Sequence, residues 1–150
     1  MTDAGWRDLE AAAPRIAAAG AALLDRSTGA ALLATVRGLD TAPRLHPVTV
    51  GIVQGGLYVF VLDSAKRRDL EEDGRYAVHA HQDPAAPNEF SVRGRARLVP
   101  AGAVRDRVAT GWFFEVDDTY WLFELRIETA ILGERAADEW PPRYTRWSAT

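Results

Sequence analysis

Residues 44–62, RLHPVTVGIVQGGLYVFVL, predict a β-hairpin near the middle of the chain. The segments on either side of Gly55-Gly56 are rich in Val, Leu, Ile and aromatic side chains, as is typical of two strands joined by a tight turn. Pro47 and Gly51 interrupt the first strand, over residues 44–53. Such interruptions are usual at a sheet edge, at a bulge or where a ligand approaches the backbone. The hairpin therefore joins one irregular strand to one regular strand.

Further strands and three helices are expected around this hairpin. The expected strands cover residues 30–37, 44–53, 57–62, 75–82, 88–99 and 120–132. The expected helices cover residues 6–26, the segment between the N-cap Ser64 and the stop Gly74, and residues 101–111. Hairpin-linked strands with few helices favour an antiparallel sheet, and six strands of this length can close into a barrel. The predicted fold is therefore mainly β, with peripheral helices around a six-stranded antiparallel barrel.

Side-chain alternation indicates which faces of the last two strands are buried. In residues 88–99 the face expected in the core consists of Phe90, Val92, Gly94, Ala96 and Leu98. In residues 120–132 the corresponding face consists of Trp121, Phe123, Leu125, Ile127 and Ile131. The tail, residues 139–150, has prolines and aromatic residues but no period, so it predicts no regular element.

The composition excludes several classes of protein. The 150 residues have a net charge of −3 and are 47% hydrophobic, which suits one domain over residues 1–150 and argues against a protein that coats nucleic acid. The absence of cysteine removes disulfides, thiolate nucleophiles and cysteine-ligated zinc, and it fits a cytoplasmic protein. Acidic residues near the N-terminus argue against a signal peptide, and no apolar run approaches the roughly 18 residues of a membrane span.

Residues 62–74, LDSAKRRDLEEDG, contain Lys66, the only lysine of the chain. A helix that begins after Ser64 presents unpaired backbone N–H groups and a partial positive charge. The ammonium of Lys66 and the guanidinium of Arg67 would complete an anion site there. An ordinary capped helix explains the same residues equally well, with its bases paired to Asp69, Glu71, Glu72 and Asp73. These acids are expected to be solvated.

The irregular strand over residues 44–53 is a second candidate site. Thr49 and Gly51 share one face, which is therefore shallow. A flat aromatic ligand could lie against such a backbone and bond to its N–H and C=O groups. A bulged barrel strand that turns a corner uses Gly and Pro in the same way, and the residues alone favour this second interpretation.

Two further clusters carry weaker signals. His79 and His81 project from one face of a strand and could share a metal with Asp83, but this spacing is a loose zinc signature, so no metal is expected. The second cluster is a row of arginines on the strand over residues 88–99, formed by Arg93, Arg95 and Arg97. These like charges repel one another unless acids on a neighbouring strand or a bound anion counter them. Glycine-rich phosphate loops and hydrolase nucleophile motifs are absent from the sequence.

Taken in order, these segments resemble the pyridoxamine 5′-phosphate oxidase-like family, the split β-barrel flavoproteins. The resemblance rests on LLATVRGLDTAPRLHPVTV, on GGLYVFVLDSAKRRDLEEDGRYAVHAH with its Ser-x-Lys turn, and on EFSVRGRARLV and WLFELRIETA. It covers about residues 6–132 in order, which is more specific than any single motif.

The resemblance implies a six-stranded antiparallel split β-barrel of the FMN-binding type. It also implies a homodimer with two cofactor sites at the subunit interface. The usual ligand of the family is FMN, and some members use a deazaflavin or bind haem. By resemblance, the cofactor phosphate would be held by Ser64, Lys66 and Arg44, with Arg67 as a helper. The backbone that meets the ring edge would belong to His46, Pro47, Val48 and Thr49.

The chain departs from true pyridoxamine phosphate oxidases, so vitamin B6 oxidation is not expected. Ala65 and Val50-Gly51 stand where those enzymes have basic residues, and only Arg146-Trp147 lies in the region of their substrate-binding arginine motif. The hypothesis is a flavin-dependent oxidoreductase that acts on a small planar substrate, with no catalytic residue identified. The alternatives are a deazaflavin-dependent reductase and a non-catalytic flavin-binding, haem-binding or sensor protein. Candidates for an aromatic wall that stacks on the substrate are Trp112, Phe113, Phe114, Trp140 and Trp147. For Phe113 and Phe114 at least, packing in the core or at a dimer contact is the preferred interpretation.

Overall fold

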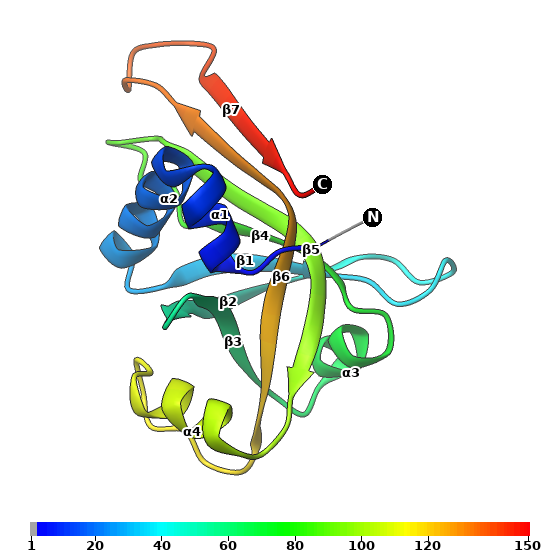
Figure 1. The fold of residues 1–150 in the computed structure, drawn as a ribbon. Coiled ribbons are helices and arrows are strands. Elements are labelled where there is room, and N and C mark those ends of the chain that lie inside the picture. Colours follow the sequence, from blue (N-terminus) through cyan, green and yellow to red (C-terminus); the bar gives the residue numbers. More distant parts are fainter. Residues whose placement is uncertain (1–2) are drawn as a thin grey trace.

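The computed structural model describes residues 3–150, and its main feature is one antiparallel sheet that closes on itself (Figure 1). The strands are β1 (Ala30–Thr35), β2 (Arg44–Val53), β3 (Gly56–Leu62), β4 (Arg75–Ala80), β5 (Glu89–Val99), β6 (Tyr120–Glu134) and β7 (Arg143–Ser148). The helices are α1 (Trp6–Ala12), α2 (Pro14–Arg26), α3 (Ala65–Glu72) and α4 (Ala103–Thr110). No helix within residues 3–150 is long and apolar enough to cross a membrane.

The first six strands form the predicted barrel. The order in the sheet is β3-β2-β1-β4-β5-β6-β7, and β3 also pairs with β6, which closes the ring. β7 lies outside the ring as an extra strand on β6, next to the C-terminus in Figure 1. The expected mainly β fold, a six-stranded antiparallel split barrel with peripheral helices, is therefore confirmed.

Inward-facing side chains fill the barrel. Leu33, Val59 and Phe123 are fully buried there, and Trp6 and Leu9 of α1 belong to the same buried cluster. Each large apolar side chain that is removed from water in this way stabilises the fold by about 1.5–3 kcal/mol. The core thus holds α1 and α2 against the barrel, as Figure 1 shows.

The helix expected over residues 6–26 is in fact two helices. α1 ends at Ala12 and α2 begins at Pro14, with Ala13 between them at φ −139° and ψ 65°. Proline has no N–H for the helix ladder and disfavours helical backbone in the residue before it, so Ala13 leaves the helical region. Pro14 then occupies the start of α2, where no donor is needed.

A β-bulge in β6 changes which face of this strand is buried. The register between β5 and β6 shifts at Arg93 and Gly94, which leaves Glu128 of β6 as the extra residue. Beyond the bulge Leu132 is buried, whereas Ile131 is partly exposed. The assignment of Ile131 to the core face is therefore wrong, because an inserted residue exchanges the two faces of a strand.

β7 is the element that the sequence did not predict. Residues Arg143–Ser148 pair with β6 at the edge of the sheet, and most of their side chains are exposed. The strand therefore lacks the apolar alternation that identifies a half-buried strand. Smaller differences occur at the ends of elements: β1 and β4 end earlier than expected, β6 extends to Glu134, and Leu98 near the end of β5 is 37% exposed.

The barrel is split between β2 and β3. Their registered pairs run only from Val50 with Val59 down to the turn. Further from the turn, residues 44–49 of β2 pair with β1 alone, and residues 60–62 of β3 pair with β6 alone. The two strands of the hairpin thus separate, and each has one edge without a strand partner.

Candidate functional site

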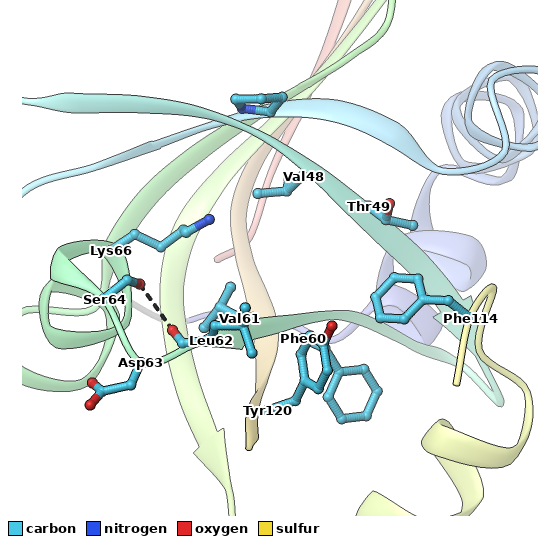
Figure 2. Close-up of a pocket in the computed structure, with 11 residues that line it drawn as sticks. Val48, Thr49, Phe60, Val61, Leu62, Asp63, Ser64, Lys66, Phe114 and Tyr120 are labelled. Atoms are coloured by element: carbon cyan, nitrogen blue, oxygen red, sulfur yellow. Dashed lines mark hydrogen bonds between the residues drawn. The ribbon is translucent and has the colours of Figure 1, made fainter. Parts of the chain in front are cut away.

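A cavity of about 620 Å³ lies where β2 and β3 separate (Figure 2). Its walls are the two strand edges, the turn into α3, and aromatic side chains near α4. Among the residues predicted to bind a cofactor, those that line it are Pro47, Val48, Thr49, Ser64 and Lys66. The volume is in the range of small-molecule sites. The separation of β2 and β3 therefore brings the two predicted sites, the irregular strand and the Ser-x-Lys turn, to opposite sides of one cavity.

Lys66 projects from the first turn of α3 into this cavity (Figure 2). Within the part of the chain that the structure describes, its ammonium group forms no ion pair, and burial lowers the pKa of Lys66 without any acid opposing that shift. A partly desolvated and unpaired ammonium group is stabilised by a bound anion. Lys66 is therefore the strongest candidate anion ligand in the cavity.

Ser64 caps α3, as predicted. Its hydroxyl accepts a hydrogen bond from the backbone N–H of Arg67 at 3.2 Å and donates one to the carbonyl of Leu62 at 2.9 Å. For residues 3–150, no partner is found for the backbone N–H groups of Ala65 and Lys66. Ser64 thus shapes the turn, and the helix start leaves two donors and a partial positive charge next to Lys66.

Arg67 does not line the cavity. Its guanidinium lies 2.7 Å from a carboxylate oxygen of Asp63 and 2.5 Å from one of Glu71, and it lies 4.5 Å from the ring centroid of Trp121. Arg67 therefore pairs with nearby acids, as expected for an ordinary capped helix. Any contribution of Arg67 to anion binding is reduced by its two acidic partners.

Arg44 is also paired, with an acid that was expected to be solvated. Asp69 is 0% exposed; it accepts hydrogen bonds from Thr35 Oγ1 at 2.8 Å and from Arg44 Nε at 2.9 Å. Arg37 adds a third contact, with its Nε 3.4 Å from the other carboxylate oxygen. The expectation of a solvated Asp69 is wrong, because α3 packs this residue against β1 and β2.

His46 lies opposite Leu33 on β2, on the core side of the strand, and does not line the cavity. Its Nε2 atom is buried and has no hydrogen-bond partner among the described residues. Burial and the nearby charges of Lys66 and Arg44 lower the pKa of His46. The imidazole is therefore neutral at physiological pH and adds no fixed charge to the site.

Trp112 fills the shallow face that was expected to receive a flat ligand at Gly51. A Cβ atom at Gly51 would lie 2.6 Å from Cζ3 of Trp112 and 3.0 Å from Phe113. The glycine therefore makes room for an aromatic side chain of the protein itself. Ligand access to β2 is left at residues 47–49.

One end of the cavity is aromatic. Phe114 and Tyr120 line it with a distance of 5.6 Å between ring centroids, and Phe60 lies beside them. Phe114 is the candidate wall residue that lines this cavity, although packing in the core or at a dimer contact was the preferred expectation for it; Trp140 and Trp147 lie just before β7 and within it. This end offers flat apolar surface for a planar molecule.

Sequence patterns do not identify Phe60, Val61, Leu62, Asp63 or Tyr120 as cavity residues. Asp63 carries a usable signal, because it directly precedes the predicted N-cap and belongs to the same turn. The other four reach the cavity only because β2 and β3 separate, and no local pattern indicates where a ladder between two strands stops.

The two weaker clusters lie elsewhere. A hollow of about 520 Å³ adjoins the cavity at Pro47 and contains His79 and His81. His79 Nδ1 donates to the carbonyl of Ala80 at 2.7 Å, and its Nε2 is 3.9 Å from Glu89. Over residues 3–150, no three His, Asp or Glu side chains are grouped in a way that could hold a metal ion.

Acids counter part of the arginine row on β5. Arg95 lies 3.9 Å from Glu128 on the neighbouring strand, and Arg97 lies 3.7 Å from Asp3. Such exposed pairs stabilise a fold by at most about 1 kcal/mol. The row is thus an outer, partly paired face of the sheet and is separate from the cavity.

No known protein-family model and no curated protein matches this sequence. Solved structures do match it. PhzG from Burkholderia lata, in complex with tetrahydrophenazine-1-carboxylic acid, has a TM-score of 0.64 and 13% identity over 86% of this chain and 82% of its own. HutZ, the haem storage protein of Vibrio cholerae, has a TM-score of 0.59 and 18% identity over 69% of this chain and 84% of its own. A candidate pyridoxamine 5′-phosphate oxidase from Listeria innocua has a TM-score of 0.58 and 18% identity over 73% of this chain and 90% of its own.

The chain shares their split-barrel fold. This agrees with the resemblance to pyridoxamine 5′-phosphate oxidase-like proteins, at low sequence identity. Because a haem storage protein is among the split barrels that match, the fold alone does not choose the ligand. The choice of ligand therefore depends on the residues that line the cavity.

Proposed function

We propose that the cavity between β2 and β3 binds a flavin, with FMN as the first candidate, and that the protein is a flavin-dependent oxidoreductase. The observation that carries this proposal is that a single cavity of about 620 Å³ contains both an unpaired ammonium group and an open strand edge. A flavin phosphate needs the first feature, and the polar edge of the flavin ring can use the second.

Lys66 is the proposed phosphate ligand. The backbone N–H groups of Ala65 and Lys66 lie at the same helix start and favour an anion there. Ser64 supports the site by holding the turn in shape. Arg44 and Arg67 contribute less than Lys66 in this proposal, because each already has an acidic partner.

The flavin ring is proposed to lie along residues 47–49. On the β3 side, this edge of β2 has no strand partner, so its backbone groups can bond to the ring. Phe114 and Tyr120 would then offer an aromatic surface to a small planar substrate. A bound flavin supplies the hydride or electron transfer, while the chain binds the ring, orients it and keeps water from part of it.

A homodimer and a cytoplasmic location complete the proposal. Leu32 and Leu45 on the outer face beside the cavity are 47% and 65% exposed, as expected of a surface that a second copy covers. The absence of cysteine fits a reducing compartment. No nucleic-acid or membrane partner is proposed.

The absorbance spectrum of the purified protein tests the proposal. A flavin absorption band at about 450 nm is expected, retained after desalting or restored by added FMN. Native mass spectrometry after reconstitution should show a dimer with two flavins. An absorption band at about 420 nm with strong fluorescence would indicate a deazaflavin instead, and a Soret band would indicate haem. A colourless protein that takes up none of these ligands would refute the proposal.

A further inference from the structure

Tyr120 brings a hydroxyl group to the aromatic end of the cavity. It is the first residue of β6, and its hydroxyl points toward the space between β2 and β3 (Figure 2). The hydroxyls of Tyr76 and Tyr144 donate to protein acceptors at 2.8 Å and 3.1 Å, whereas for residues 3–150 no partner is found for that of Tyr120. The hydroxyl of Tyr120 is therefore available to a molecule in the cavity.

Neighbouring groups hold Tyr120 in this place. Arg105 donates hydrogen bonds from Nη2 to the backbone carbonyls of Asp117 and Tyr120, both at 2.9 Å. The ring centroid of Tyr120 lies 5.6 Å from that of Phe114 and 6.4 Å from that of Phe60. Because both its backbone and its ring have close neighbours, Tyr120 presents its hydroxyl at a defined point of the cavity wall.

This end of the cavity has no charged lining side chain among the described residues. Asp63 and Lys66 line the cavity at the turn into α3, on the opposite side of the view in Figure 2. Thr49 adds a second hydroxyl, but it belongs to the strand edge that is proposed to bind the flavin ring. A flat molecule at the aromatic end thus meets apolar rings and the hydroxyl of Tyr120. A charged group would lose water there without gaining an ionic partner.

We infer that Tyr120 determines the substrate specificity of this cavity, by donating a hydrogen bond to the carbonyl oxygen of a flat, uncharged carbonyl compound. A carbonyl oxygen accepts such a bond, whereas a hydrocarbon of the same shape displaces water from the hydroxyl and gives it no partner. The inference rests on the proposed function, because it names the class of molecule that would stack on the bound flavin.

Fluorene and 9-fluorenone test this specificity, because they share one flat skeleton and only 9-fluorenone has a carbonyl oxygen. Equilibrium dialysis gives a Kd for each probe, with and without saturating FMN. The protein should bind 9-fluorenone more tightly than fluorene by about 2- to 12-fold, as expected for one net hydrogen bond between neutral groups. FMN should not weaken the binding of 9-fluorenone, since the two ligands are expected to occupy different parts of the cavity.

Tyr120→Phe is the decisive variant. It keeps the aromatic ring and removes a hydroxyl that has no partner within residues 3–150, so the variant should fold normally. The Kd for 9-fluorenone should rise to about that for fluorene, while the Kd values for fluorene and FMN should stay unchanged. Tyr144→Phe removes the hydroxyl of a 59% exposed tyrosine on β7, outside the cavity, and is the matched control. It should leave all three Kd values unchanged.

The outcomes separate this inference from the proposed function. Equal binding of the two probes by the unaltered protein, binding of neither probe, or an unchanged ratio of their Kd values in Tyr120→Phe would overturn the inference. Competition between FMN and 9-fluorenone would also overturn it, and in each of these cases a measured Kd for FMN would leave the flavin site standing. If FMN does not bind but the ratio depends on Tyr120, the proposed function fails, while Tyr120 still selects the flat molecules that the cavity accepts.

Discussion

Replacing Lys66 by methionine is the sharpest test of the proposed phosphate site. Methionine keeps most of the length and the apolar bulk of lysine but removes the charge. A hydrogen bond to a charged group contributes about 1.5–3 kcal/mol, so the Kd for FMN should rise by about 10- to 150-fold. The cavity gives no other unpaired ammonium group that could replace Lys66, because this is the only lysine of the sequence.

The same substitution should hardly change stability. In the described chain Lys66 has no ion pair, and burial lowers its pKa, so its removal leaves no buried partner without a contact. The free energy of unfolding is therefore expected to change by less than about 0.5 kcal/mol. Urea unfolding without ligand measures this change.

Riboflavin and a neighbouring arginine provide the controls. Riboflavin shares the ring of FMN but has no phosphate, so Lys66→Met should leave its Kd unchanged. Arg68→Met removes an exposed charge from the same helix and should weaken FMN binding by less than about threefold. The reasoning is refuted if Lys66→Met weakens both flavins equally, or if the loss of FMN binding is matched by a loss of stability.

Three further predictions concern the fold. A Cβ atom at Gly94 would lie 2.0 Å from the carbonyl oxygen of Arg126, so Gly94→Ala should destabilise the protein by about 2–3 kcal/mol in urea unfolding; an unchanged midpoint would mean that the bulge is not as tight as described. Asp69→Ala leaves Thr35 and Arg44 without their buried acceptor and should lower the free energy of unfolding by about 1–3 kcal/mol, because Arg44 is 33% exposed and stays partly hydrated; urea unfolding at neutral pH would show this loss. Because the pKa of His46 is lowered from 6.5 in the fold, the unfolded chain binds more protons below that pH, and stability should fall as the pH drops. His46→Gln should flatten this fall, and an identical pH dependence of the urea midpoint in both proteins would contradict the assignment.

The order of strands and turns was predictable because local rules decide it. Gly55 and Gly74 have φ values of 81° and 86°, which glycine adopts readily. Gly55 lies in the turn between β2 and β3, and Gly74 lies between α3 and β4, where the period of the sequence changes. The capped start of α3 follows in the same way from Ser64. Neighbouring residues are enough to specify such features.

Features that depend on distant partners were not predictable. The bulge at Glu128 exists only in relation to β5, so the pattern of β6 alone places Ile131 on the wrong face. β7 forms because an edge of β6 is available, although its own side chains are mostly exposed. Pairing in both cases outweighs the local pattern.

The candidate site also combines local features, which the sequence predicts, with contacts between distant residues, which it does not. The Ser64–Lys66 turn and residues 47–49 are local features, and the structure brings them to one cavity. The partner of Arg44 is not local. Asp69 lies on a short helix beside the exposed Glu71 and Glu72, and only the packing of α3 on the barrel buries it and pairs it with Arg44.

The open seam, where residues 44–49 of β2 and 60–62 of β3 are not paired with each other, also affects how the protein moves without a ligand. Every other junction of the barrel is held by a backbone ladder, whereas residues 44–49 and 60–62 have no rungs between them. Local opening should therefore begin at this seam, and amide hydrogen exchange should be fastest along its two edges. A bound ligand that bonds to either edge takes the place of the missing rungs. Ligand binding should therefore make both strands more rigid. Without a ligand, the unpaired edges of β2 and β3 are where an extended peptide from another chain could add a strand to the sheet.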